Sequence, residues 1–173
     1  MANQNWVALT NYASQNVTGA TYTGTAITDI SPTPDLTLPA GWATAGTVLR
    51  VNALGQFVGG GSVTTLTLQI MYGGTGGTSL FTTGAVTVSV SVTNNWWIEA
   101  YIRVMVPGTS GTVNTWGRQQ GVSTTANIGV PVLIGSTSTT INTQTANTLI
   151  LAATAGVAFT SVICYQFLVE QLN

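Results

Sequence analysis

The chain is almost without the residues that build the polar face of an α-helix. It contains no Lys and only two Glu, Glu99 and Glu170, and its Ala residues are scattered. No segment shows apolar residues at helical spacing with charged residues on the opposite side, which is the pattern of an amphipathic helix. We therefore expect an all-β protein.

Alternation of apolar and polar residues predicts where the strands lie. Val86–Val92 alternates Val with Thr or Ser without a break, so its four Val residues share one face. Less regular patterns predict seven more strands, at Thr21–Ile27, Thr47–Val58, Val63–Tyr72, Trp96–Val106, Val113–Gly121, Thr148–Ala153 and Thr160–Leu172. Because no crossover helices are available, about eight short strands predict an antiparallel two-sheet sandwich or jelly roll.

The length of 173 residues fits one domain. A chain of this size buries roughly 70% of the surface that its unfolded form exposes, so its core can stabilise the fold without a disulfide or a metal ion. The single cysteine, Cys164, lies in an apolar run, and we expect a small buried side chain rather than a disulfide or a reactive thiol.

Charge restricts the possible partners. Charged residues make up 4% of the chain, where about 25% is ordinary. Arg50, Arg103 and Arg118 are the only basic side chains, too few to bind the phosphates of nucleic acid or an anionic membrane. No apolar stretch approaches the roughly 20 residues of a spanning helix, and the first ten residues do not resemble a secretory signal. We expect no nucleic acid and no membrane as partner, and synthesis in a cytoplasm without a signal peptide.

The residues that support catalysis are sparse. The chain has no His and no Lys, the usual groups for acid–base catalysis near neutral pH. Its carboxylates are Asp29, Asp35, Glu99 and Glu170, of which the two Asp are expected to serve turns. An enzyme stays open only if the fold brings two of these carboxylates together in a cleft. The clusters that zinc or calcium needs are missing from the sequence, so we expect no enzyme, no cofactor and no metal site.

The segment Asn94–Val106 is apolar on both of its predicted faces. One face carries Trp96, Ile98, Ala100, Ile102, Val104 and Val106, and the other carries Trp97, Glu99, Tyr101, Arg103 and Met105. A strand in an antiparallel sandwich normally has one polar face that is exposed to solvent. Because both faces of this strand are apolar, we expect the second face to be covered as well, by the core or by another subunit. A carbohydrate platform is the alternative, although adjacent Trp96 and Trp97 point to opposite faces and cannot form one stacking surface.

The last predicted strand repeats this pattern. Alternation places Ile163, Tyr165, Phe167 and Val169 on one face and Val162, Cys164 and Leu168 on the other. Glu170 is expected either to face solvent or to meet one of the three Arg residues.

A surface of Thr, Ser, Asn and Gly with almost no charge favours assembly. It lacks the net charge that keeps soluble monomers apart, and it forms neutral hydrogen-bonded interfaces without desolvating ions. Because almost nothing titrates between about pH 5 and 8, we expect assembly to be insensitive to pH and salt in this range.

The chain resembles a class of small bacteriophage virion proteins with a jelly-roll, tumour-necrosis-factor-like sandwich. The resemblance rests on Leu36–Trp42 leading into Thr47–Phe57, on Thr65–Gly74 and on the closing strand Ile163–Leu172. In that class, a segment with Leu-Pro, a turn, Leu-Arg, Gly and an aromatic residue precedes a strand that ends in paired glycines. Members serve as capsid decoration (cement) proteins or in fibres, and they have no catalytic residues to carry over.

The resemblance implies a jelly-roll domain at residues 31–173, with residues 1–30 an N-terminal arm or the first strands. It implies a virion protein that forms a homotrimer and binds the major capsid protein. Trp6 and Tyr12 are expected to dock on the capsid, and the three Arg residues to make intersubunit hydrogen bonds. The residues expected in the subunit or capsid interface are Trp6, Tyr12, Trp97, Tyr101, Met105 and Arg103. The alternatives are another virion shell subunit or a receptor- or glycan-binding fibre head, whose loops Gly73–Gly77 and Gly135–Asn147 would touch the host.

Overall fold

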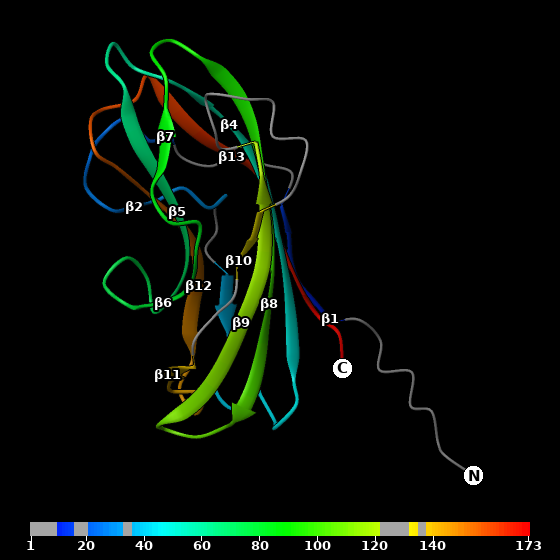
Figure 1. The fold of residues 1–173 in the computed structure, drawn as a ribbon. Coiled ribbons are helices and arrows are strands. Elements are labelled where there is room, and N and C mark those ends of the chain that lie inside the picture. Colours follow the sequence, from blue (N-terminus) through cyan, green and yellow to red (C-terminus); the bar gives the residue numbers. More distant parts are fainter. Residues whose placement is uncertain (1–9, 16–20, 33–35, 122–131, 135–137) are drawn as a thin grey trace.

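Two antiparallel β-sheets packed face to face form the protein, as seen in the computed structural model (Figure 1). The structure describes residues 10–15, 21–32, 36–121, 132–134 and 138–173, with side chains outside 10–15 and 132–134. These residues contain thirteen strands and no helix. The expectation of an all-β, antiparallel two-sheet sandwich is confirmed, with more strands than the eight predicted.

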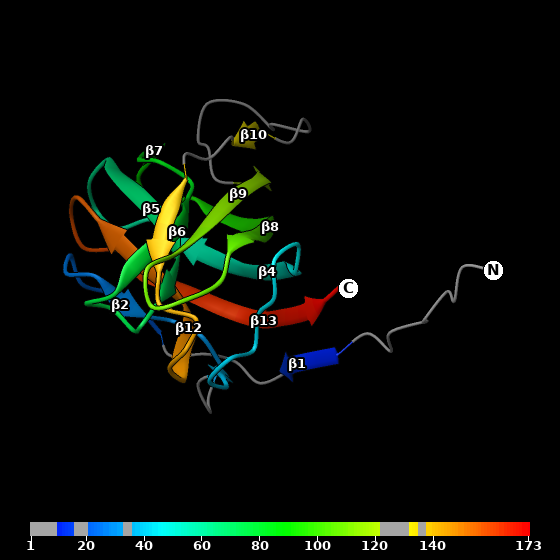
Figure 2. The same cartoon turned by 90° about the horizontal axis from the view of Figure 1, so that it is seen from below.

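The larger sheet has seven strands. Figure 2 shows the strands from β1 to β10 arranged side by side. In spatial order they are β1 (Thr10–Gln15), β13 (Ser161–Gln171), β4 (Val48–Val58), β8 (Thr93–Val106), β9 (Gly111–Gln120) and β10 (Val132–Ile134), and β11 (Thr139–Ile141) pairs with the far end of β9. The four long central strands, β13, β4, β8 and β9, build most of this sheet.

The smaller sheet has six strands. Its order is β2 (Thr28–Asp29), β12 (Asn147–Ala155), β5 (Thr64–Tyr72) and β6 (Thr78–Thr82), while β3 (Leu36–Leu38) pairs with β12 and β7 (Val86–Val88) pairs with β5. The chain passes from one sheet to the other six times, after β1, β3, β4, β7, β11 and β12.

The core lies between the sheets, where the period-two alternation of each strand directs apolar side chains inward. In β8, for example, Trp96, Ile98, Ala100, Ile102 and Val104 are all buried, as the sequence predicted for this face. Val106 is 55% exposed, because a bulge between Val104 and Val106 breaks the register with β9.

Six of the eight predicted strands are present as long strands: β4, β5, β8, β9, β12 and β13. The prediction of Val86–Val92 is wrong in its second half, since β7 ends at Val88 and a turn follows. In that turn Ser91 has a φ of 54°, and its N–H donates to the Gly60 carbonyl. The prediction of Thr21–Ile27 is also wrong, because only Tyr22 forms a bridge, to Val162.

A bulge in β13 overturns the faces predicted for that strand. The register with β4 shifts between Cys164 and Gln166, so the alternation skips one residue. Val162 and Cys164 are buried before the bulge, and Phe167 and Val169 are buried after it. Tyr165, which alternation had placed with Phe167, is instead exposed. Cys164 is fully buried, as predicted, and burial raises the pKa of its thiol to about 12.

The first thirty residues contribute β1 to the larger sheet and β2 to the smaller one. Of the residues predicted to dock on a capsid, Trp6 lies outside the described residues, and Tyr12 lies in β1, where only the backbone is described. Asp29 serves a turn, as predicted, because its Oδ1 accepts a hydrogen bond of 2.8 Å from the Ser31 N–H. Among the described residues, no helix has the length and apolar character needed to cross a membrane.

Candidate interaction surface

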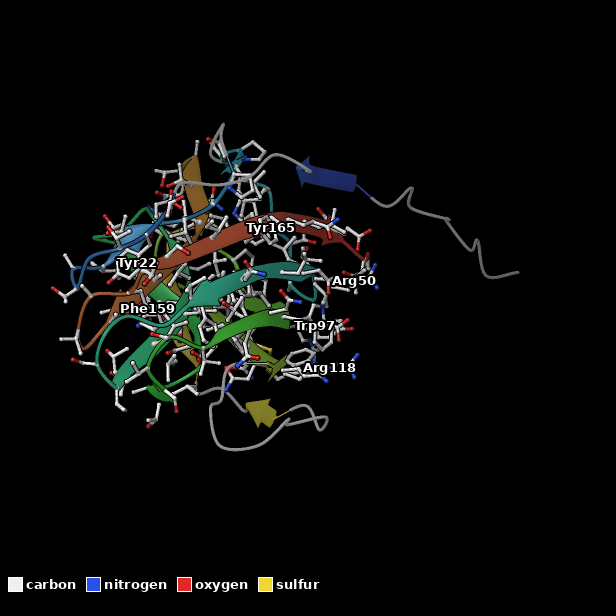
Figure 3. All side chains as sticks on the ribbon, turned by 90° about the horizontal axis from the view of Figure 1, so that it is seen from above. Tyr22, Arg50, Trp97, Arg118, Phe159 and Tyr165 are labelled. Carbon is white, nitrogen blue, oxygen red and sulfur yellow. The ribbon has the colours of Figure 1, made fainter. Side chains whose placement is uncertain are left out.

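The outer face of the seven-stranded sheet differs in composition from the Thr- and Ser-rich rest of the chain. Figure 3 shows Arg50, Trp97 and Arg118 close together on this side of the sandwich. We call it the aromatic–arginine face and define it by Arg50 and Leu54 on β4, Trp97, Glu99, Tyr101, Arg103 and Met105 on β8, Trp116 and Arg118 on β9, and Tyr165, Leu168 and Glu170 on β13. All three Arg residues of the chain and both Glu residues lie on it.

The strand register explains why these side chains meet. Antiparallel pairing places Glu170 opposite Arg50, Arg50 opposite Tyr101, and Tyr101 opposite Trp116, in one row across four strands. The next row places Glu99 opposite Arg118. Since side chains directly opposite each other lie about 5 Å apart, each row makes cross-strand contacts without any loop.

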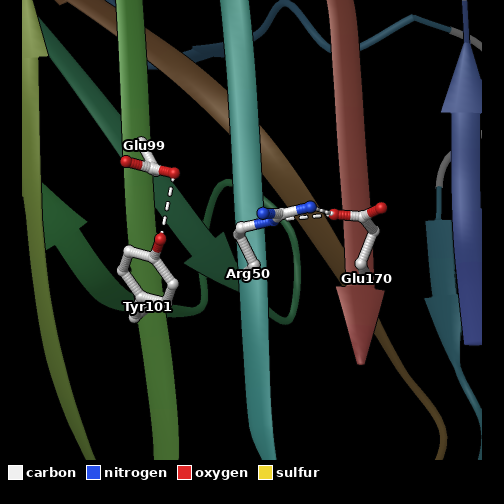
Figure 4. A network of polar contacts seen from close by, with 4 residues as sticks. All are labelled: Arg50, Glu99, Tyr101 and Glu170. Atoms are coloured by element: carbon white, nitrogen blue, oxygen red, sulfur yellow. Dashed lines mark hydrogen bonds and ion pairs between the residues drawn. The ribbon is translucent and has the colours of Figure 1, made fainter. Parts of the chain in front are cut away.

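Both Glu carboxylates are bound to Arg side chains of the same chain. Arg50 donates to Glu170 Oε2 from Nε at 2.7 Å and from Nη2, as Figure 4 shows. Arg118 Nε donates to Glu99 Oε2 at 2.7 Å, and the Tyr101 hydroxyl donates to Glu99 Oε1 at 3.0 Å. The two carboxylates are therefore neutralised within the face rather than offered to a ligand.

These contacts also shift pKa values. The hydrogen bond to Glu170 raises the pKa of Arg50, and burial together with the bond to Glu99 raises the pKa of Tyr101. Arg50 therefore stays charged and Tyr101 stays protonated at neutral pH.

Aromatic rings fill the space between the charged groups. Tyr101 and Trp116 stack with centroids 5.8 Å apart and planes 11° apart. The guanidinium carbon of Arg118 lies 5.0 Å from the centre of the Trp97 ring, a cation–π contact. Both Trp side chains are held in place by neighbours from the adjacent strand.

The face also carries exposed apolar surface. Leu54, Met105, Trp116 and Tyr165 are four of the ten large apolar side chains that are exposed among the described residues, and Trp116 is 43% exposed. The other six lie in turns or at strand ends. These four side chains are spread along one sheet face that also carries Trp97 and Tyr101. Exposed apolar surface gathered on one face is typical of a binding surface, whereas single exposed residues are ordinary.

The structure brings four of the predicted interface residues, Trp97, Tyr101, Arg103 and Met105, to this one face. Arg50 and Arg118, predicted to bond across subunits, have carboxylate partners in their own chain, while Arg103 is exposed and forms no ion pair with a described residue. Sequence reasoning missed Trp116, although its alternation with Arg118 in the predicted strand Val113–Gly121 was a usable signal.

Three of the four carboxylates lie among the described residues, and Asp35 lies outside them. Asp29 lies in the smaller sheet, and Glu99 and Glu170 are each occupied by Arg. Among the described residues, no group of three or more His, Cys, Asp or Glu could hold a metal ion.

Comparison with known proteins adds no relative to this description. No protein-family model, no curated protein and no solved structure matches the chain. Its function has to be argued from the sandwich and from the aromatic–arginine face.

Proposed function

We propose that this is a non-enzymatic structural protein of a bacteriophage virion, and that it decorates the capsid by binding neighbouring major capsid subunits. The observation that carries the proposal is the aromatic–arginine face, where exposed Trp116 and Met105 lie on the same sheet face as ion pairs that are already formed. Such a face is suited to contact with protein, because binding desolvates apolar surface without leaving the Glu residues unpaired.

The strand order supports the jelly-roll expectation. In the larger sheet β13 lies between β1 and β4, and in the smaller sheet β12 lies between β3 and β5. Strands close to the two ends of the chain thus pair side by side in both sheets, as in a Greek-key sandwich with long connections.

The proposed mechanism is passive. A homotrimer would present three copies of each capsid-binding surface, and weak contacts made together bind far more tightly than one contact alone. Bridging neighbouring capsid subunits in this way resists their separation under internal pressure.

Addition of the purified protein to capsids that lack it tests this function. We expect saturable binding and a higher temperature of capsid disruption. Capsids that bind none of the protein at micromolar concentration would contradict the proposal.

A second candidate is the receptor- or glycan-binding head of a fibre. It is favoured by the position of Trp97, Tyr101 and Trp116 on one face, since this removes the objection that the adjacent Trp96 and Trp97 diverge. Binding to a glycan array or to host cells that is lost on Trp116→Ala would support this candidate over capsid decoration.

A further inference from the structure

We infer that the aromatic–arginine face docks a second copy of this chain. The inference rests on the homotrimer of the proposed function, and it names the surface and its occupant. Three features of the face lead to it: its size, its charge, and the way its aromatic rings are held.

The size of the face fits a stable interface between subunits. Strands β13, β4, β8 and β9 contain 11, 11, 14 and 10 residues and lie side by side. At about 3.3 Å per residue and about 4.8 Å between strands, the four strands cover a flat area of roughly 600 Å², and the protruding side chains add further surface. A standard interface buries about 800 Å² on each partner, so this face with its protruding side chains is of the right size.

The charge of the face fits a copy of itself better than a strongly charged partner. Its five charged groups give a net charge of +1, from three Arg and two Glu, and two ion pairs already join four of them. Arg103 remains as the one cation of the face without a carboxylate among the described residues. A second copy presents neutral oxygen atoms of side chains such as Asn52 and Gln56 that can accept hydrogen bonds from this guanidinium, whereas a polyanion would find one available cation.

The aromatic rings are arranged for packing against protein. One face of the Trp116 ring lies against Tyr101, and one face of the Trp97 ring lies against Arg118. Sugars stack on open ring faces, so these neighbours reduce the surface available to a glycan. Trp, Tyr, Arg and Met, all present on this face, are enriched at the centre of protein interfaces.

The test compares Leu54→Glu with Val63→Glu by light scattering after size-exclusion chromatography. Leu54 lies on β4, one of the two inner strands of the four, and is 38% exposed, so an unassembled chain tolerates Glu there. Val63, 58% exposed just before β5, is the matched control outside the face. We expect the wild type and the control to have a mass that is a multiple of 17.8 kDa, and Leu54→Glu to elute as a 17.8 kDa monomer.

The expected weakening is at least about 100-fold in the dissociation constant, because assembly would bury an unpaired carboxylate. Far-UV circular dichroism checks that the variant is folded, and Met105→Glu, at a residue that is 41% exposed, repeats the test if it is not. A wild type that stays monomeric overturns the inference, as does a folded Leu54→Glu protein that keeps the wild-type mass.

The outcome is separable from that of the capsid experiment. An oligomer that Leu54→Glu dissociates but that ignores capsids supports the docking face and contradicts decoration. A monomer that saturates capsids supports decoration and contradicts the docking face. A monomer that binds glycans through Trp116 contradicts both and favours the fibre head.

Discussion

Glu99 and Arg118 lie directly opposite each other in the antiparallel register of β8 and β9, and Arg118 Nε donates to Glu99 Oε2 at 2.7 Å. Glu99 is 8% exposed and also accepts the Tyr101 hydroxyl hydrogen bond, so both of its oxygen atoms are used. This carboxylate is buried on the outside of a sheet, and its charge is tolerated because the adjacent strand supplies a guanidinium.

Glu99→Gln is expected to lower the free energy of unfolding by about 1–2 kcal/mol. The amide keeps the shape but loses the charge-assisted bond to Arg118, and the half-exposed guanidinium limits the loss through solvent screening. Urea denaturation measures the effect in chains that also carry Leu54→Glu, so that self-association does not contribute. Arg103→Gln is the control and should change stability by less than about 0.5 kcal/mol. Equal effects of the two substitutions would show that the ion pair contributes nothing.

The sequence was sufficient for the class of fold because the long strands carry their own pattern. Strands such as β4 and β8 have ten or more residues, and neither Gly nor Pro interrupts their alternation of apolar and polar residues. Strands β2, β3, β10 and β11 have two or three residues each, which is too short for any periodicity to appear.

Local features that alternation cannot encode caused the errors. The bulge at Cys164 and Gln166 depends on the pairing of β13 with β4, so Tyr165 and Phe167 were assigned to the wrong faces. Likewise, the candidate face could be predicted only strand by strand. That Arg50 meets Glu170, 120 residues later, depends on which strands become neighbours.

Cys164 is expected to make stability depend on alkaline pH. Its thiol has a pKa of about 12 in the folded chain because burial disfavours the thiolate, against an ordinary value of 9.0. Between these values the unfolded chain has lost a proton that the folded chain retains. The stabilisation is therefore complete below pH 9 and is lost as the pH rises toward 12, by about 1.4 kcal/mol per pH unit.

Urea denaturation of the wild type and of Cys164→Ala, from pH 8 to pH 11, measures this effect. The tyrosines titrate in both proteins, so the difference between the two slopes isolates the thiol. We expect the wild type to lose stability more steeply above pH 9, and parallel curves would contradict the assignment. At pH 8 the native thiol should react with a disulfide reagent only at the rate of unfolding.

Gly55→Ala is expected to destabilise the protein by more than about 3 kcal/mol. A Cβ atom at this position would lie 2.0 Å from the Ile163 carbonyl oxygen, in the backbone of β13, and 2.4 Å from the ring of Trp96, which is buried in the core. Neither the backbone of β13 nor a buried indole moves easily in a close-packed interior. Thermal unfolding measures the loss, and Gly61→Ala is the control, because no atom lies within 4 Å of its added Cβ. Similar melting temperatures for the two variants would refute the close approach of Trp96 to Gly55.

Ser91→Gly is expected to stabilise the protein by about 0.5–1 kcal/mol. Ser91 is the one described non-glycine residue with a positive φ, 54°, a conformation that glycine adopts without the steric cost of a Cβ atom. Ser89→Gly, two residues earlier and without a positive φ, adds the same backbone freedom to the unfolded chain and relieves no strain, so it should destabilise by a similar amount. Urea denaturation of both variants measures the contrast. A gain of stability in Ser91→Gly with a loss in Ser89→Gly would agree with a turn after β7. A loss of stability in both variants would favour the uninterrupted strand Val86–Val92 that alternation predicts.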